Sequence, residues 1–228
     1  MAWAGFALAA AAVLIWNWLA MRGVAGPDRE ADDPGWRPLA TRRALPLYTA
    51  GLVFGITSAI YLSFAADRFA ATDGPAGVSR SAIPALVFVF YGSCGLLGLL
   101  ADRLRARLGM VNALRLLLVT AALSLLLVAL IPGRWAGLVL SAGLQGITVM
   151  MLSAVFAMWA DSLFPALTSR GMTALLLAVS AGSVIGPVAA GMIETAFGPV
   201  AMFTGAAILP VLAAAWLRDP AVGPEESG

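Results

Sequence analysis

The sequence predicts an all-α protein, a polytopic membrane bundle of about seven transmembrane helices. Of the 228 residues, 61% are hydrophobic and only 11% are charged, whereas ordinary soluble domains contain roughly 25% charged residues. So few charges cannot cover the surface of a water-soluble globule, and most of the surface must therefore face lipid. The hydrophobic residues suffice for about seven helices of the roughly 20 residues that cross a hydrocarbon core.

Apolar runs separated by charged residues or by Gly and Pro mark the expected helices in order. No basic residue precedes the first run, and Trp16 and Trp18 stand where a signal peptide would have small residues, so we expect an uncleaved span. The later boundaries are, in turn, a charged linker, a Gly- and Pro-containing turn, a run of arginines, a Pro-Gly pair, a loop that contains a proline and an arginine, and a Gly-Pro pair. The expected spans are 2–20, 45–66, 81–101, 110–131, 134–158, 171–193 and 199–217.

A charged linker divides these helices unevenly. Residues 21–43 contain five arginines, four acidic residues and three prolines, a composition that cannot bury apolar surface and predicts a flexible cytoplasmic segment. One span, 1–20, precedes the linker. Six spans follow it and are expected to form a compact unit, 44–217, before a polar tail at 218–228.

The arginines predict the orientation of the chain. Lysine is absent, and ten of the 14 arginines fall in segments that would share one side of the membrane, against three on the other side. The remaining one, Arg115, lies near the start of the fourth span and is expected to extend toward the side of the ten. Cytoplasmic loops carry the excess of basic residues, so we expect a protein of the cytoplasmic membrane with its N-terminus outside and its C-terminus in the cytoplasm. The ten are Arg22, Arg29, Arg37, Arg42, Arg43, Arg103, Arg105, Arg107, Arg170 and Arg218, and the three are Arg68, Arg80 and Arg134.

The residues that the chain lacks exclude most site chemistries. There is no histidine or lysine, and Cys94 is the single cysteine, so His- or Cys-based metal sites, Ser-His-Asp triads and Schiff-base lysines each lack a required residue. We therefore expect neither an enzyme nor a bound metal or cofactor. A net charge of +2 is too small to indicate a nucleic-acid partner, which leaves a small molecule and the lipid bilayer.

The segment 98–107 carries the most specific pattern in the chain. Gly98 would let a neighbouring helix approach, Asp102 could pair with an arginine across a helix gap, and the arginines could bind helix ends or anionic headgroups. Gly98, Asp102, Arg103 and Arg107 match the cytoplasmic loop signature of the major facilitator superfamily, which the segment therefore resembles. Arg105 stands where that signature usually has a second glycine, as in the degenerate copy after the family's eighth helix. The alternative is a basic loop that contains one acid by chance.

This resemblance covers the whole chain and implies its function. The first span would be the family's sixth helix, residues 21–43 its central cytoplasmic loop, and 44–217 its C-terminal six-helix half. The family consists of secondary active transporters that work by alternating access. The resemblance thus implies a partial chain whose partner would be the missing N-terminal half.

The sixth span strengthens the resemblance. Gly182, Gly186, Pro187 and Gly191 resemble the Gly/Pro motif of antiporters in the family, which lies in the helix symmetry-related to this one. The proline removes one helix hydrogen bond and the glycines permit a bend, so we expect a gating helix; the direction of transport stays open. Spans three and six are both rich in small residues and run in opposite directions, as in inverted repeats, although bundle packing alone favours the same residues.

Four polar residues are candidates for binding a substrate. The resemblance assigns spans two and five to the central cavity, where Thr57 and Tyr61 share one helix face and Gln145 and Thr148 lie on the other span. An amide at mid-depth costs free energy unless it is paired, so Gln145 is the strongest candidate, with an interhelical hydrogen bond as the alternative. Carboxylates occur only near helix ends, which favours an uncharged or amphipathic substrate. A self-contained seven-helix receptor or sensor is the alternative function, and the long charged linker argues against it.

Overall fold

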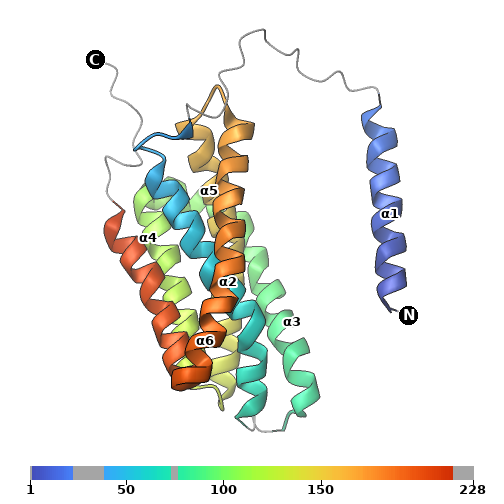
Figure 1. Ribbon diagram of the computed structural model, residues 1–228, viewed down its shortest axis with the longest axis vertical. Coiled ribbons are helices and arrows are strands. Elements are labelled where there is room, and N and C mark those ends of the chain that lie inside the picture. The colour runs from blue at the N-terminus through green and yellow to red at the C-terminus, as the bar shows by residue number, and fades with distance from the viewer. Residues whose placement is uncertain (1, 23–38, 73–76, 218–228) are drawn as a thin grey trace. The chain divides into compact units, whose positions relative to one another are not determined.

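The computed structural model describes residues 2–22, 39–72 and 77–217, and within these ranges it contains helices and turns but no strand. The all-α prediction is confirmed (Figure 1). The chain divides into two units, Met1–Gly35 and Trp36–Gly228. The tail 218–228 and most of the expected linker lie outside the described residues.

The described part of the first unit contains one helix, α1 (Ala2–Met21), which matches the first expected span. The exposed side chains near its end include Trp18, and the guanidinium carbon of Arg22 lies 3.6 Å from the centroid of that indole ring. A cation over an aromatic ring at the end of an apolar helix is typical of a membrane–water interface.

The second unit is a bundle of long apolar helices. Its elements are α2 (Leu45–Ala71), the 3₁₀ turn η2 (Arg80–Ala82), α3 (Ile83–Gly95), the 3₁₀ segment η3 (Leu96–Leu100), α4 (Ala101–Leu130), α5 (Trp135–Leu163) and α6 (Thr168–Trp216). Among the described residues, four helical stretches are long and apolar enough to cross a membrane, namely 45–71, 80–130, 135–163 and 168–216. The prediction of membrane-spanning helices therefore holds, and the count of seven stays a prediction.

Two glycines interrupt the longest helical stretches. Gly109 in α4 has φ 76° and ψ 166°, and Gly198 in α6 has φ 82° and ψ 169°, a combination open essentially to glycine alone. The chain folds back at both, because Ile83 and Val128 lie in one core cluster and Leu175 and Leu217 lie in another. A straight helix would separate the two members of each pair by more than about 60 Å. In Figure 1 the two parts of α6, in orange and red, meet near the bottom of the view and diverge upward.

Replacing either of these glycines with alanine is expected to lower the melting temperature by about 3–8 °C, because a side chain in this backbone region costs roughly 1–3 kcal/mol. Melting of the detergent-solubilised protein can be followed by intrinsic fluorescence. Gly191→Ala is the matched control, since Gly191 is helical and an added Cβ would have no heavy atom within 4 Å. Unchanged melting of Gly109→Ala and Gly198→Ala would contradict the prediction.

Glycines also bring two pairs of helices into backbone contact. A Cβ on Gly55 of α2 would overlap the carbonyl oxygen of Val179 in α6, and a Cβ on Gly146 of α5 would overlap the carbonyl oxygen of Tyr91 in α3. Small residues at such positions allow helix backbones to approach closely. The first part of α6 is thus packed onto α2, and α3 is packed onto α5.

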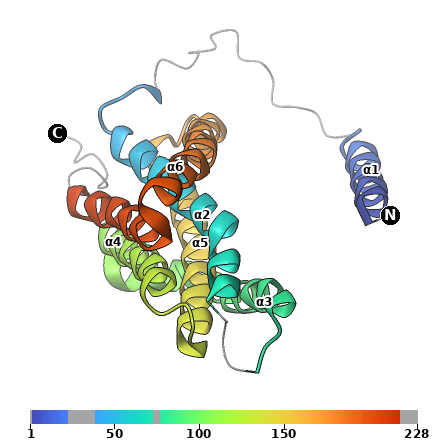
Figure 2. The ribbon, with the colours of Figure 1, turned by 60° about the horizontal axis from the view of Figure 1, so that its bottom comes forward.

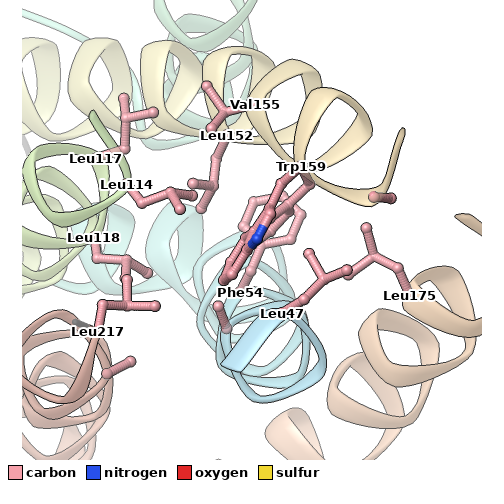
Figure 3. Close-up of a cluster of buried hydrophobic side chains, with 14 of the residues drawn as sticks. Leu47, Phe54, Leu114, Leu117, Leu118, Leu152, Val155, Trp159, Leu175 and Leu217 are labelled. Carbon is pink, nitrogen blue, oxygen red and sulfur yellow. The ribbon is translucent and has the colours of Figure 1, made fainter. Parts of the chain in front are cut away.

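The remaining helices complete the bundle. In Figure 2, α2 and α5 lie between the first part of α6 and α3, while α4 and the second part of α6 lie beside each other. Large side chains in the interior form two core clusters. One is built around Trp159 and includes Leu47, Leu114, Leu118, Leu152 and Leu217 (Figure 3), and the other contains Phe69, Ile83, Leu125, Leu138 and Phe203.

The described arginines of the bundle separate to its two ends. The basic end is where α2 begins, the chain breaks at Gly109, and α6 begins and ends; it carries Arg42, Arg43, Arg103, Arg105, Arg107, Arg115 and Arg170. There Arg115 donates a hydrogen bond to the carbonyl of Leu217, which caps the end of α6. The opposite end carries Arg68, Arg80 and Arg134, and its turns meet where Gly133 lies beside Thr72.

Two sequence expectations need correction at the basic end. The segment 98–107 was expected to leave the helix at Asp102, but Ala101–Leu108 is helical and the chain breaks only at Gly109. The last part of the expected linker packs against the bundle. Leu39 is buried in the Trp159 cluster, and its carbonyl accepts a hydrogen bond of 3.1 Å from the Tyr48 hydroxyl.

Candidate functional site

The four candidate substrate residues all lie in the interior of the bundle. Thr57, Tyr61, Gln145 and Thr148 are each at most 1% exposed. Thr57 and Tyr61 lie one turn apart on α2, and Gln145 and Thr148 lie one turn apart on α5. A substrate could reach these side chains only if neighbouring helices moved apart.

The two candidates on α2 have hydrogen-bond partners. The Thr57 hydroxyl donates to the carbonyl of Val53 in its own helix, at 2.9 Å. The Tyr61 hydroxyl accepts from Ser141 of α5 at 3.2 Å. Ser124 of α4 in turn donates to the carbonyl of Ser141 at 2.9 Å. Tyr61, Ser124 and Ser141, called the Tyr61 network below, therefore join three helices.

Sequence reasoning missed the two serines of this network. Ser124 and Ser141 are both fully buried, whereas serines are mostly exposed in proteins. Ser141 lies four residues before Gln145, and this spacing places both on the same face of a helix. That spacing was available in the sequence and could have pointed to a polar face on α5.

Replacing Ser141 with alanine is expected to lower the melting temperature by about 3–6 °C, because the Tyr61 hydroxyl and the Ser124 carbonyl each lose a donor within reach, at roughly 1–2 kcal/mol. Ser153→Ala on the same helix is the control, since the exposed Ser153 hydroxyl bonds only to the carbonyl of Val149 in its own helix. Both proteins are melted in the same detergent. If the melting temperature of Ser141→Ala falls no more than that of Ser153→Ala, the Tyr61 network does not stabilise the bundle.

The two candidates on α5 lack hydrogen-bond partners among the described residues. Both polar atoms of the Gln145 amide and the hydroxyl oxygen of Thr148 are buried and unbonded. A buried polar group without a partner costs roughly 1–3 kcal/mol by mutational measures. In the described part of the chain, Gln145 forms neither the interhelical hydrogen bond that was the alternative for it nor a bond within α5.

Aromatic side chains lie on both sides of these unpaired groups. Toward the basic end, the ring centroids of Phe54 and Phe156 are 5.7 Å apart in an edge-to-face contact, beside the buried Trp159 (Figure 3). Toward the opposite end, Tyr61 stacks on Tyr91 of α3 with ring centroids 6.5 Å apart. Edge-to-face and offset-stacked rings are favourable arrangements, so both contacts hold α2 against its neighbours.

The Gly98–Arg107 segment provides one close helix contact and one ion pair. A Cβ on Gly98 would lie 2.5 Å from the Cβ of Met150 on α5, so this glycine does allow a helix to approach. Asp102 forms its ion pair with Arg105, at 3.0 Å and three residues further along the same helix. The expected pairing across a helix gap is not present in the described part of the chain, and Arg103 and Arg107 are exposed.

Two glycines of the Gly/Pro motif of α6 pack against α2, and the third does not. Gly182 and Gly186 face α2, where a Cβ on Gly186 would lie 2.7 Å from the carbonyl oxygen of Ile56. Pro187 lies inside the helix. Gly191 has open space around it. Two members of the motif therefore serve the contact with α2, and the gating role stays a prediction.

The carboxylates of the described bundle lie away from the unpaired amide. Asp67 is in the last part of α2, Asp161 in the last turn of α5, and Glu194 close to the break at Gly198. Asp161 accepts a hydrogen bond of 2.9 Å from Thr168. Within the ranges that the structure describes, no three His, Cys, Asp or Glu side chains gather where they could hold a metal ion.

Comparisons with known proteins found no relative of this chain. No protein-family model matches the chain, and no curated protein or solved structure does so either.

Proposed function

We propose that the chain is the C-terminal half of a secondary transporter of the major facilitator type, which moves a small uncharged or amphipathic molecule across the cytoplasmic membrane by alternating access. Six helices would form this half, counted with the breaks at Gly109 and Gly198, and α1 would be the helix that precedes it. The other half would supply the opposite wall of the central cavity.

The observation that carries this proposal is an internal correspondence between two sets of three helices. The first set is 45–71, 80–108 and 110–130, and the second is 135–163, 168–197 and 199–216. Each set has a glycine break with nearly identical backbone angles between its second and third helices. The backbone of the first helix of each set also touches the second helix of the other set at a glycine, as the Gly55–Val179 and Gly146–Tyr91 contacts show.

The corresponding positions support one repeat with inverted topology. Gly55 and Gly146, like Gly109 and Gly198, lie about 90 positions apart in the chain. The first set begins at the basic end and the second at the opposite end. Inverted repeats of this kind are the hallmark of many secondary transporters, whereas a seven-helix receptor has no need of them.

The chemistry of the interior supports an uncharged substrate. Among the described residues, the fully buried polar side chains are hydroxyls and one amide, namely Thr57, Ser124, Ser141, Gln145 and Thr148. A charged substrate would require a buried counter-charge. The described carboxylates instead lie toward helix ends, so a neutral molecule with a few hydrogen-bonding groups fits better.

Transport of a neutral dye tests the proposal. Cells take up N-phenylnaphthylamine, and the chain is expressed alone or joined to the coding sequence upstream of its first codon. The joined protein is expected to change dye accumulation at least threefold, and Asp102→Asn is expected to abolish most of this change without lowering expression. The chain alone is expected to transport nothing. Transport by the chain alone, or an upstream frame that encodes no further spans, would contradict the proposal.

A further inference from the structure

The unpaired groups on α5 lie on a boundary between two helix pairs. The α2 and first-α6 pair and the α3 and α5 pair each meet backbone to backbone through glycines. Between the pairs, α2 meets α5 through side chains, as in the Tyr61–Ser141 hydrogen bond and the Phe54–Phe156 contact. We call this boundary between α2 and α5 the seam. Backbone contacts leave no side chain to rearrange, so movement within the bundle is easier at the seam.

Helix geometry places Gln145 and Thr148 on the seam. Ser141, Gln145 and Thr148 follow one another at helical spacing and share one face of α5. That face turns toward α2 and α4, because Ser141 bonds to Tyr61 and Ser124.

The level of Gln145 follows from the direction of each helix. Gln145 lies one turn beyond Ser141 toward the basic end, and Thr57 lies one turn from Tyr61 in the same direction. The amide therefore lies between the Tyr61 network and the Phe54–Phe156 contact.

The chemistry of these groups defines what they would bind. The Gln145 amide supplies N–H donors and one acceptor, and the Thr148 hydroxyl can donate or accept. Their atoms are buried and unbonded among the described residues. No charged residue occurs within about two helical turns of this level on α2, α4 or α5, in residues 53–61, 117–125 and 141–152. A charged ligand would lack a counter-charge there, whereas a hydroxyl, a carboxamide or water would complete the hydrogen bonds.

We propose that the seam is a binding site for a small neutral hydrogen-bonding group, held by the amide of Gln145 and the hydroxyl of Thr148, and that α2 and α5 part to admit it. The group belongs either to water or to a solute that the protein carries. The second source rests on the proposed function, and the first does not. The site is distinct from the exposed faces of the bundle, since its side chains are buried in the six-helix unit itself.

Thiol labelling tests whether the site is reachable. Cys94 is replaced with serine, Thr148 with cysteine, and membrane vesicles are treated with 2-hydroxyethyl methanethiosulfonate, a neutral reagent that bears a hydroxyl. Thr148→Cys is expected to react at least tenfold faster than Leu152→Cys, one turn further on the same face but inside the apolar Trp159 cluster. Ser169→Cys, exposed at the start of α6, confirms that the reagent is active. Reaction of Thr148→Cys no faster than Leu152→Cys would overturn the proposal.

Protection experiments separate the two sources of the group. Benzamide and benzoate, a neutral and an anionic compound of the same shape, are added during labelling. Slower labelling with benzamide alone identifies a neutral solute as the occupant, and unchanged labelling with both identifies water. Protection by benzoate equal to that by benzamide would contradict a neutral site.

A volume-conserving variant separates binding from packing. Gln145→Met removes both hydrogen-bonding atoms and is expected to abolish benzamide protection while the melting temperature stays within about 3 °C of the parent, or rises. A fall of more than about 8 °C together with unreactive Thr148→Cys would assign Gln145 to packing. None of the three readouts depends on transport. If Thr148→Cys reacts and benzamide protects it, but the protein transports nothing, the proposed transport function is refuted and the binding site is not.

Discussion

Gly55→Ala and Gly146→Ala are each expected to lower the melting temperature by about 5–10 °C and to reduce the yield of monodisperse protein severalfold. The added methyl group would overlap a backbone oxygen, of Val179 or of Tyr91, that cannot rotate away as a side chain could. The two helices would have to separate along their length. Overpacking of this kind costs roughly 1–3 kcal/mol, and in lipid close van der Waals packing is a main force that holds helices together.

Two other helical glycines provide the control. Gly92 in α3 and Gly205 in α6 have no heavy atom within 4 Å of an added Cβ. Alanine there removes the conformational cost of glycine in a helix, so the melting temperature should be unchanged or slightly raised. The proteins are compared by size-exclusion chromatography and by fluorescence-monitored melting in one detergent. If Gly55→Ala and Gly146→Ala behave as Gly92→Ala does, the two helix pairs are not locked through glycines.

A comparison of the stability lost in Gly55→Ala and in Gly146→Ala also tests the internal repeat. Gly55 and Gly146 occupy corresponding positions in the two sets of three helices, and each meets one carbonyl of the partner helix. If the two sets form one inverted repeat, the two substitutions should cost similar amounts of stability. A large loss at one position and none at the other would weaken the observation on which the proposed function rests.

The helices of this chain could be predicted from the sequence because their signals are local. Apolar runs, arginines and Gly-Pro pairs indicate where spans begin and end, and the breaks at Gly109 and Gly198 fall within one residue of the expected starts at 110 and 199. The predicted end of the third span, at Ala101, was wrong. Charged residues suggested a loop after Ala101, but Asp102 and Arg105 at i and i+3 satisfy each other within one helix.

The state of the candidate site could not be predicted because it depends on which face of each helix turns inward. Thr57 and Gln145 are both polar residues within apolar runs of the sequence. Thr57 bonds to a carbonyl one turn back in its own helix. The side chain of Gln145 has no hydrogen-bond partner among the described residues. Helix periodicity places residues on a face, but only packing against α2 and α4 decides which polar groups are paired.

Trp159→Ala is expected to lower the melting temperature by about 10 °C or more. The indole is completely buried at the centre of its core cluster, against Phe54 and Leu47 of α2 among others (Figure 3). Truncation of a buried Trp to alanine costs roughly 3–5 kcal/mol, because neighbouring side chains relax only partly into the cavity. Trp216→Ala, at an exposed position of α6, is the control and should melt within about 3 °C of the parent.

A milder substitution at the same position separates shape from hydrogen bonding. The indole N–H of Trp159 is buried and unbonded among the described residues, so Trp159→Phe removes an unsatisfied donor and keeps most of the apolar volume. It is expected to cost less than about 1.5 kcal/mol. If Trp159→Phe is as harmful as Trp159→Ala, the N–H has a partner and the position depends on hydrogen bonding rather than on filled volume.

The same substitution connects stability with access to the seam. Trp159 and the Phe54–Phe156 contact lie between Gln145 and the basic end, so they close the seam on that side. Removing the indole is therefore expected to speed labelling of Thr148→Cys by 2-hydroxyethyl methanethiosulfonate at least threefold below the melting transition, while Trp216→Ala leaves the rate unchanged. Slower or equal labelling in Trp159→Ala would mean that the group reaches Thr148 from the opposite end, past Tyr61, and that the Tyr61 network is the barrier that opens.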